Sequence, residues 1–436
     1  MAKRKSSIYV EILVPVILLM IMLFGSVVVT SMSVFDKTYT SNLKKQITDY
    51  SEFFSKNISS FMDGIYNLGV GLSYSPELLS MDGDLQTTVL VNNVKTVSYF
   101  ELLYIQDMDG NQTARSSGTL GNRKDRWWFT ETIEKKSPFV SKSYFSISTG
   151  STCASMFFPM FTDKGMVGIF AMDIKLNSIQ SIVDEFSDKE TGRFTVIIDG
   201  EGNIVSHPNK DYVEKCYNYV SKTYQDTVKD SAGNYVKDAS GNIQTQLSKF
   251  EVDDNFANEV PKMIKGESNT LEVIFEGQKS FVSYCPITFP GASDSWTVIT
   301  VQPRSYLNAL LSSVFTRALL IGFAITLGAL VIVFLIARKI TRPIAQMIPV
   351  LKNISEGDFT GSMNVGKLNN EIGSIGDGFN GVIDMLRVLI GSVKDASLSL
   401  NNYSQNLNVN VANSAKLLEQ SLESMASITE KVNTPP

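Results

Sequence analysis

Two long apolar segments constrain the fold of this chain more than any other feature. The first runs from Ile8 to Val34, with Glu11 as its only charged residue, and the second runs from Ala318 to Ala337 without any charge. A helix needs about 20 apolar residues to cross the hydrocarbon core of a bilayer. We therefore predict transmembrane helices at 8–34 and 318–337. A cleaved signal peptide is the alternative for the first, but that segment is too long and lacks a clear cleavage site.

Basic residues beside these segments predict their orientation. Lys and Arg cluster just before the first segment and just after the second, as Lys3, Arg4, Lys5, Arg338, Lys339 and Arg342. Such clusters mark the cytoplasmic side of a membrane. We expect residues 1–7 and those after about 338 to be cytoplasmic. The region 35–317 is then extracellular or periplasmic, in a cell-membrane protein with two spans.

Composition excludes several classes of function. The net charge of −5 argues against a nucleic-acid partner. His207 is the one histidine, and the three cysteines, Cys153, Cys216 and Cys285, show no metal-site spacing and allow at most one internal bridge. We expect no enzyme activity, no cofactor and no metal. His207 follows a turn signal, so we expect it at the surface.

The outer region begins with a helical pattern. Apolar residues recur at steps of three and four at Leu43, Ile47, Phe54, Ile58, Phe61, Ile65, Leu68 and Leu72. This stripe predicts a long helix over 35–75, with roughly 45 Å of it facing a sheet or a dimer partner.

Strand and turn signals then occur twice. The strand pairs VSYFELLYIQDMDGNQTA and CASMFFPMFTDKGMVGIFAMDIKL precede a helix at SIQSIVDEFSDKETG. RFTVIIDGEGNIVSHPN, GQKSFVSYCPITF and SWTVITVQP repeat the strand pattern. We predict two related α/β subdomains, a membrane-distal one at about 76–190 and a membrane-proximal one at about 191–303. The polar stretch 220–262 is interpreted as a hairpin insertion rather than a site.

The region behind the second span is predicted to be all helical. A helix at RKITRPIAQMIPVLKNISEGDF is followed by another at LNNEIGSIGDGFNGVIDMLRVLIGSV. A seam of three-four spacing with polar interruptions then continues toward the C-terminus. Its members are Leu386, Leu389, Val393, Ala396, Leu400, Tyr403, Leu407, Asn410, Ser414, Leu418, Met425, Ile428 and Val432.

This order of segments resembles the bacterial methyl-accepting chemotaxis receptors. The supporting motifs are MVGIFAMDIKL, DGEGNIVSHPN, Pro343, ISEGDF from Ile354 and NEIG from Asn370. The resemblance implies an α/β double Cache (dCache) sensor, with two PAS-like subdomains on a long N-terminal helix. An all-α HAMP linker at 338–392 and the start of a coiled coil at 393–436 would follow. It also implies a homodimer that senses a ligand and controls chemotaxis.

Two residues suit the HAMP helices physically. Pro343 fits an early helical position, where its missing N–H costs little, and Glu371 fits the start of the second helix, where a carboxylate favours the dipole. In the family a long helical hairpin follows, whose tip binds a histidine kinase and an adaptor protein. The 436 residues contain no such tip, so we expect this chain to sense and transmit rather than control a kinase.

The stretch NRKDRWWFT, residues 122–130, carries the candidate site. Arg126, Trp128 and Phe129 match part of the family's amino-acid-binding motif, and Tyr144 and Asp173 stand where its later members would be. Gly121 occupies a place where the family often has an aromatic residue. The resemblance therefore implies that an α-amino acid binds in the distal subdomain.

The chemistry of these residues fits a zwitterion. Arg126 can hold the carboxylate with two hydrogen bonds, aided by the Trp128 indole, while Asp173 pairs with the ammonium beside the Tyr144 hydroxyl. A structural Arg126–Asp173 ion pair is the alternative. Candidates for the side-chain pocket are Ser146, Ser148 and Cys153.

Two other functions remain open at this stage. The second hypothesis is a receptor with the same frame for a different ligand, such as a biogenic amine, a purine or an organic acid. The chain also fits the sensor part of a histidine kinase or nucleotide cyclase, although the sequence has no phosphate-binding glycine loop and no nucleophile–base pair.

Overall fold

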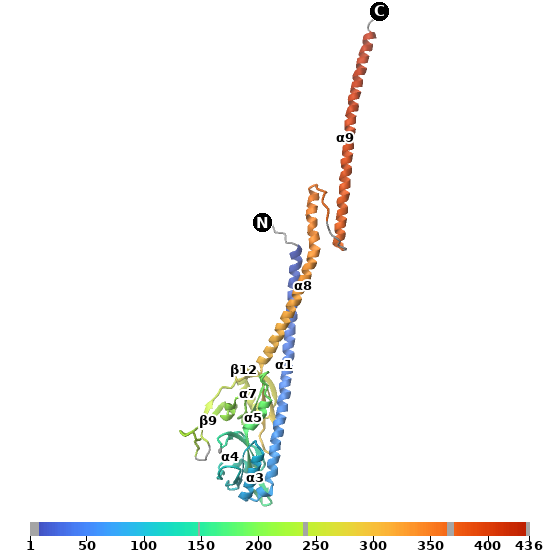
Figure 1. Cartoon of the computed structure of the whole chain (residues 1–436). Coiled ribbons are helices and arrows are strands. Elements are labelled where there is room, and N and C mark those ends of the chain that lie inside the picture. Colours follow the sequence, from blue (N-terminus) through green and yellow to red (C-terminus); the bar gives the residue numbers. More distant parts are fainter. Residues whose placement is uncertain (1–7, 147–148, 239–242, 364–369, 433–436) are drawn as a thin grey trace. The chain divides into compact units, whose positions relative to one another are not determined.

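The computed structural model describes residues 8–146, 149–238, 243–363 and 370–432. The chain separates into two compact units (Figure 1). One unit comprises residues 29–318, and the other combines 1–28 with 319–436. Each unit is described by itself below.

The first helix, α1 (Ile8–Ser73), is continuous. The predicted stripe faces inward: Leu43, Ile47, Phe54, Ile58 and Ile65 are all buried. Figure 1 shows this part of α1 running along both sheet-containing subdomains. Within the described residues, α1 from Leu13 and α8 (Arg304–Ser355) are long and apolar enough to cross a membrane, by length and composition.

The distal subdomain is an antiparallel six-stranded sheet in the order β2-β1-β6-β5-β3, with β4 also paired to β5. Its strands are β1 (Phe100–Asp107), β2 (Gln112–Arg115), β3 (Phe139–Val140), β4 (Tyr144–Phe145), β5 (Thr152–Thr162) and β6 (Gly165–Lys175). Its helices are α2 (Pro76–Leu79), α3 (Gly83–Thr96), α4 (Trp127–Lys135) and α5 (Leu176–Glu185).

The proximal subdomain is a five-stranded sheet in the order β11-β12-β13-β7-β8. Its strands are β7 (Phe194–Ile198), β8 (Ile204–Ser206), β11 (Asn269–Phe275), β12 (Gln278–Ile287) and β13 (Trp296–Pro303), and its helices are α6 (Lys210–Glu214) and α7 (Asp254–Met263). When strands are numbered within each subdomain, leaving out β4, both sheets have the order 2-1-5-4-3. The two subdomains therefore share one topology, as the repeated sequence pattern predicts.

The same turn joins the first two strands of each sheet. In DMDGN the Asp107 carboxylate accepts the N–H groups of Asp109 and Asn111 at 2.9 Å each. In DGEGN the Asp199 carboxylate accepts those of Glu201 and Asn203 at 3.0 and 2.8 Å. Gly110 in the first turn and Gly202 in the second have positive φ angles of +83° and +86°, which disfavour a residue with a side chain.

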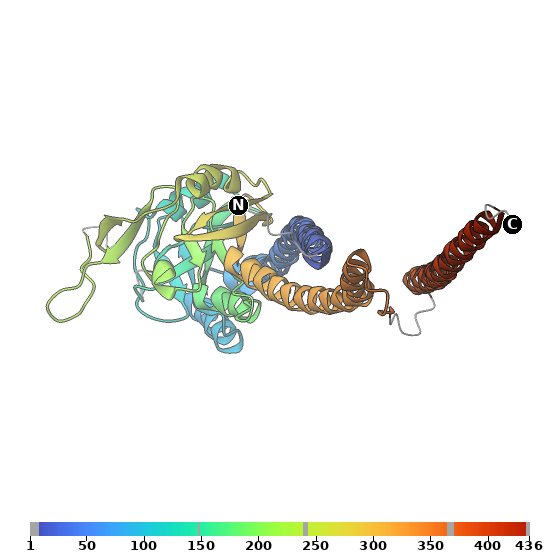
Figure 2. The ribbon, with the colours of Figure 1, turned by 90° about the horizontal axis from the view of Figure 1, so that it is seen from above.

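The predicted insertion contains a two-stranded sheet of β9 (Thr223–Thr227) and β10 (Thr245–Lys249). It projects from the body of the unit (Figures 1 and 2). The predicted range 220–262 extends too far, because residues from Asp254 onward belong to α7. The Asp253 carboxylate caps that helix by accepting the N–H of Asn255.

Hydrogen bonds hold the two subdomains together. The buried Asp199 carboxylate, besides closing its own turn, accepts the N–H of Ser143 from the distal subdomain at 2.7 Å. Lys142 forms an ion pair of 2.9 Å with Glu201, and the N–H of Ala292 donates to the Pro138 carbonyl. The segment around β4 is therefore tied directly to the proximal subdomain.

The surface position expected for His207 is wrong. The side chain is buried, and its ring stacks on Tyr212 with centroids 4.2 Å apart. Its Nδ1 accepts the N–H of Asn209, while Nε2 lies 3.0 Å from a Glu276 oxygen. The turn thus directs the imidazole into an aromatic cluster. The three cysteines, all described, are free.

In the second unit, α8 continues without interruption to Ser355, and α9 (Glu371–Val432) begins at Glu371 as predicted. Pro343 lies inside α8 rather than early in a new helix, because the apolar helix runs straight on through this position. The connector docks on α9. Asn380 bonds both backbone groups of Met363, and the Arg387 guanidinium donates to the carbonyls of Phe359, Thr360 and Gly361.

Candidate functional site

Arg126 stands immediately before α4, with an extended backbone that starts the helix. Its side chain is 7% exposed, and its Nε and Nη1 atoms have no hydrogen-bond partner among the described residues. Burial lowers the pKa of Arg126, while the neighbouring Tyr144 and Tyr104 act in the opposite direction. A guanidinium stays protonated in proteins, so this is a buried cation whose donors are not satisfied.

Asp173 lies on β6 and is 4% exposed. The Ser155 hydroxyl donates to its Oδ1 at 2.6 Å, and the Tyr144 hydroxyl lies 2.6 Å from Ser155 Oγ. Since the Ser155 hydrogen points to Asp173, Tyr144 donates to Ser155. Burial raises the pKa of Asp173 to about 7, against the lowering effect of the Ser155 hydrogen bond.

Both charged residues line one small cavity of about 30 Å³. Trp128 and Tyr144 also line it, and Arg126 forms no ion pair with Asp173 within the described residues. The structural ion pair considered from the sequence is therefore not formed. The wall consists of Leu102, Tyr104, Gln112, Arg115, Arg123, Arg126, Trp128, Tyr144, Ser146 and Asp173.

Phe129 is the one predicted site residue that is not on this wall. It packs in an apolar cluster with Phe139, Phe157 and Ile169. Trp128 belongs to the same cluster, but successive residues of a helix point about 100° apart, so its ring also reaches the cavity wall while that of Phe129 does not. The Trp128 ring stacks on Phe157 at 5.0 Å.

The side-chain pocket candidates have different positions. Ser146 is on the wall, Cys153 is buried opposite Tyr144 on β5 without lining the cavity, and Ser148 lies outside the described residues. At Gly121, where an aromatic ring is common in the family, the Arg123 guanidinium fills the adjacent space. An added Cβ at Gly121 would lie 3.1 Å from it.

Sequence reasoning missed the β1 and β2 part of the wall. Arg115 is buried, and it donates to Gln112 Oε1 at 2.9 Å and to the Ser117 carbonyl at 3.0 Å. Tyr104 lies beside it, with the guanidinium 6.0 Å from the ring centroid. An arginine within a short strand next to a turn was the available signal.

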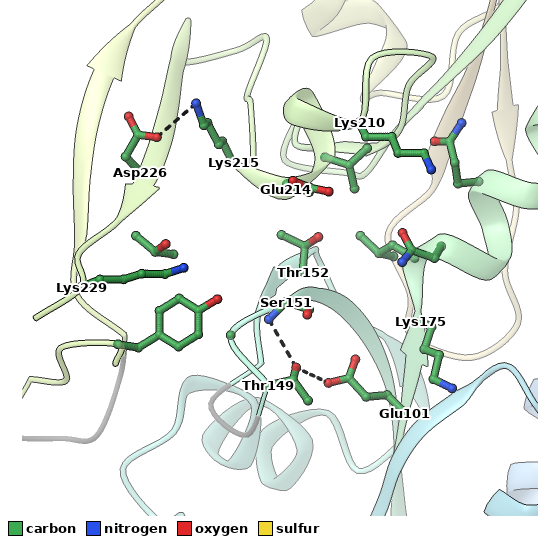
Figure 3. Close-up of a pocket in the computed structure, with 17 residues that line it drawn as sticks. Glu101, Thr149, Ser151, Thr152, Lys175, Lys210, Glu214, Lys215, Asp226 and Lys229 are labelled. Atoms are coloured by element: carbon green, nitrogen blue, oxygen red, sulfur yellow. Dashed lines mark hydrogen bonds and ion pairs between the residues drawn. The ribbon is translucent and has the colours of Figure 1, made fainter. Parts of the chain in front are cut away.

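A much larger cavity, of about 650 Å³, lies between the subdomains (Figure 3). Two of its charged groups form an ion pair, Lys215 with Asp226 at 3.4 Å, and Glu101 accepts a hydrogen bond from Thr149 at 2.5 Å. Lys175, Lys210 and Lys229 on its wall are exposed. Space alone does not define a site, so the buried, unpaired charges of the smaller cavity mark the better candidate.

Two family models match the chain. A Cache domain model, dCache_1, matches residues 31–311, and a HAMP domain model matches residues 335–388. Both describe sensor or linker modules of receptors rather than catalytic domains.

Curated relatives are methyl-accepting chemotaxis proteins. PctB of Pseudomonas aeruginosa is 21% identical over 404 residues, covering 89% of this chain and 57% of that protein. A probable methyl-accepting chemotaxis protein of Bacillus thuringiensis subsp. konkukian is 23% identical over 390 residues, covering 86% of this chain and 51% of that protein. The chain thus spans about half the length of these two relatives.

Two of the solved structures to which the chain is similar are ligand-binding domains of chemoreceptors. That of P. aeruginosa PctC, in complex with GABA, is 17% identical with a TM-score of 0.42, covering 60% of this chain and 99% of that one. That of Pseudomonas fluorescens CtaA, in complex with L-isoleucine, is 16% identical with a TM-score of 0.45, covering 63% and 98%.

Proposed function

Because the chain belongs to the Cache-domain family and carries a HAMP domain, we propose that it is a transmembrane chemoreceptor for an α-amino acid. Its relatives are chemotaxis receptors, which are not enzymes. The two apolar helices flanking the Cache domain fit a membrane protein. In this proposal residues 35–317 face outward, and the HAMP domain is cytoplasmic.

The observation that carries the proposal is the pair of buried, mutually unpaired charges on one cavity. Arg126 would bind the ligand carboxylate and Asp173 its ammonium, with Tyr144 and Trp128 orienting the ligand. The uncapped start of α4 favours the same carboxylate, because helix N-termini attract anions. Removing one charge strands the other, at roughly 3–5 kcal/mol, or about two to three decades of affinity. Phe129 would act only by packing.

Binding requires the cavity to widen. A cavity of about 30 Å³ has room for roughly two water molecules at about 10–15 Å³ each. Small-molecule pockets measure roughly 300–1,000 Å³, so the walls must separate to admit an amino acid. Arg123 and Arg126 lie between β2 and α4. Tyr144 is the first residue of β4, and Ser146 directly follows that strand. Arg123, Arg126 and Ser146 lie outside regular strands and can move more readily than the residues on β1 and β6.

A route for transmission starts at the same segment. Tyr144 is next to Ser143, whose N–H binds Asp199 in the proximal subdomain. The central strand β13 ends at Pro303, and α8 begins at Arg304, so a shift of the sheet reaches the helix directly. Arg304 also contacts Glu272 at 2.7 Å and Asp36 on α1 at 3.6 Å. A ligand shifts this system only by its differential affinity for two arrangements.

The partners follow from the family rather than from the chain itself. We propose a homodimer, for which α9 offers an exposed seam that includes Leu389, Val393, Leu400 and Leu407. A chemotaxis histidine kinase and an adaptor protein would bind the part of such receptors that lies beyond the matched region.

Titration calorimetry on the full chain in nanodiscs tests the proposal. We expect at least one of the standard L-amino acids to bind, and Arg126→Ala or Asp173→Asn to weaken it about 100-fold or more. Lys124→Ala, an exposed cation in the same segment, is the matched control and leaves affinity unchanged. The amine formed by decarboxylating the ligand binds far more weakly, since Arg126 then has no carboxylate. Equal binding by both site variants and the parent would refute the site.

A further inference from the structure

We infer that the proximal subdomain holds a second site, for a small organic cation that carries an ammonium but no carboxylate. The site is a cavity of about 590 Å³, a size typical of small-molecule pockets. Its wall includes five aromatic rings and four carboxylates, and the rings and one of the carboxylates matter most here. They are Tyr212, Tyr219, Phe250, Phe256, Phe275 and Glu276.

The rings form one connected cluster. Phe256 meets Phe275 edge-on at 4.9 Å between centroids, and Tyr219 meets Phe256 at 5.1 Å and Phe250 at 5.9 Å. The faces of aromatic rings attract cations, and the attraction grows when the cation is shielded from water. A wall of several rings therefore favours a cation over a neutral ligand of equal size.

The ionised groups of the wall add to this preference. Four of them are carboxylates, on Glu251, Asp253, Asp254 and Glu276. Lys222 is the cation on the described wall, and its Nζ lies 3.5 Å from Asp254. The net charge facing the cavity is thus negative, which repels ligands that carry a carboxylate.

Tyr219 and Glu276 place a hydroxyl and a carboxylate close together on the wall. The Tyr219 side chain is 3% exposed, and its hydroxyl faces the Glu276 carboxylate but has no hydrogen-bond partner within 3.5 Å among the described residues. Buried hydroxyls are normally satisfied. Burial, reinforced by the charge of Glu276, raises the pKa of Tyr219 well above its usual value, so the hydroxyl remains neutral. Its oxygen can then accept an N–H from an ammonium.

Glu276 occupies a backbone position that its residue type disfavours. It has a φ of +47° in the two-residue turn, Glu276–Gly277, between β11 and β12. Such turns prefer Asn, Asp or Gly, and unfavourable backbone conformations cluster at functional sites. Its carboxylate points back toward the aromatic cluster, 3.0 Å from His207 Nε2. In the proposed complex the ammonium lies between this carboxylate and the Tyr219 oxygen, with the apolar part of the ligand on Phe250 and Phe275.

A pair of ligands matched in size but different in charge tests the site. On the full chain in nanodiscs, we expect phenethylamine to bind saturably and its neutral isostere 2-phenylethanol to bind at least about tenfold more weakly. Glu276→Gln, which removes the charge at nearly constant volume, should weaken phenethylamine binding about tenfold or more, and Tyr219→Phe by a smaller factor. Glu267→Gln, at an exposed position off the wall, should change nothing.

The Asp173→Asn variant tests whether phenethylamine binds in the distal cavity instead. It should keep its affinity for phenethylamine while losing that for amino acids. Thermal unfolding of each variant checks that the fold is retained. Equal affinities for the amine and the alcohol, or no saturable binding of the amine, would overturn the inference. So would binding that survives Glu276→Gln but is lost in Asp173→Asn, because it would assign the amine to the distal cavity.

Discussion

The two subdomains share a strand order but differ in what their fifth strands bury. In the distal sheet this strand is β6, which carries Asp173 next to Ser155 on β5. In the proximal sheet it is β13, whose sequence WTVITVQP contains no ionisable residue. The proximal carboxylate assigned to the second cavity, Glu276, lies instead on the turn between β11 and β12.

This difference shows that the shared strand order determines the backbone framework of a subdomain but not which ligand it can bind. Antiparallel pairing and a packed interior require mainly apolar side chains, and β5, β6 and β13 are buried along most of their length. The chemistry depends on a few positions that break the pattern, and these positions are free to differ between repeats. This freedom is what allows the two proposed sites to differ, with a zwitterion in the distal subdomain and a cation in the proximal one.

The largest expected effects come from two buried tryptophans, Trp128 in the distal subdomain and Trp296 in the proximal one. Truncating either to Ala removes a large side chain from a packed interior, so we expect each to lower the free energy of unfolding by about 3–5 kcal/mol. Only Trp128→Ala should abolish amino-acid binding. Thermal unfolding and calorimetry on the same samples measure both quantities. If Trp296→Ala weakened amino-acid binding as strongly, the division of roles between the subdomains would fail.

The sequence predicted the parts of this fold that depend on local periodicity. The buried stripe of α1 follows from three-four spacing, and the hairpins follow from Asp–Gly turns such as those closed by Asp107 and Asp199. The strand order was not predictable from local signals. It depends on pairing between strands far apart in sequence, such as β1 with β6 and β7 with β13.

The candidate site was predictable to a similar extent. The resemblance identified Arg126, Trp128, Tyr144 and Asp173, which the fold brings to one cavity from α4, β4 and β6. Phe129 does not line this cavity. The direction of its side chain depends on the residue at which α4 begins, because each step along a helix rotates the side chain by about 100°. Arg115 was missed because its burial depends on the pairing of β2 with β1.

Because Asp173 on β6 can titrate and β13 has no ionisable residue, the distal subdomain should make the free energy of unfolding depend on pH. The pKa of Asp173 is about 7 in the folded chain, against 3.8 normally. A raised pKa means that folding favours the protonated acid. Its stabilising contribution is therefore complete below about pH 4 and is lost as the pH rises to about 7, by roughly 4 kcal/mol at most. Unfolding followed by circular dichroism across this range measures the slope.

Asp173→Asn is the control for this prediction, because it removes the titrating group and should flatten that part of the profile. An unchanged slope would show that Asp173 stays ionised in the folded chain. Amino-acid affinity gives a second readout. An ammonium ligand requires the charged acid, so the affinity should rise by up to about tenfold per pH unit as the pH approaches 7.

The two turn aspartates provide a smaller comparison. Asp199 is buried and accepts a hydrogen bond from Ser143 across the subdomains, whereas Asp107 closes only its own turn. Asp199→Ala should cost about 2–3 kcal/mol, and Asp107→Ala about 1 kcal/mol. Hydrogen exchange at β7 and β8 should respond to amino-acid binding in the parent and in Asp107→Ala, but not in Asp199→Ala. A response that persists in Asp199→Ala would remove this contact from the transmission route.

The smallest effects concern two residues with positive φ, Lys136 at the end of α4 and Glu276 at the β11–β12 turn, both at +47°. Lys136 is exposed, and its N–H closes the helix on the Thr132 carbonyl. Replacing it with Gly relieves the backbone and should raise the free energy of unfolding by about 0.5–1 kcal/mol. Glu276→Gly gains the same relief but loses the carboxylate beside His207. Its net change in thermal unfolding should therefore be near zero or destabilising, while phenethylamine affinity falls. Equal stabilisation by both substitutions would show that the Glu276 side chain contributes nothing to the fold, and retained amine affinity would separate it from the proposed cation site as well.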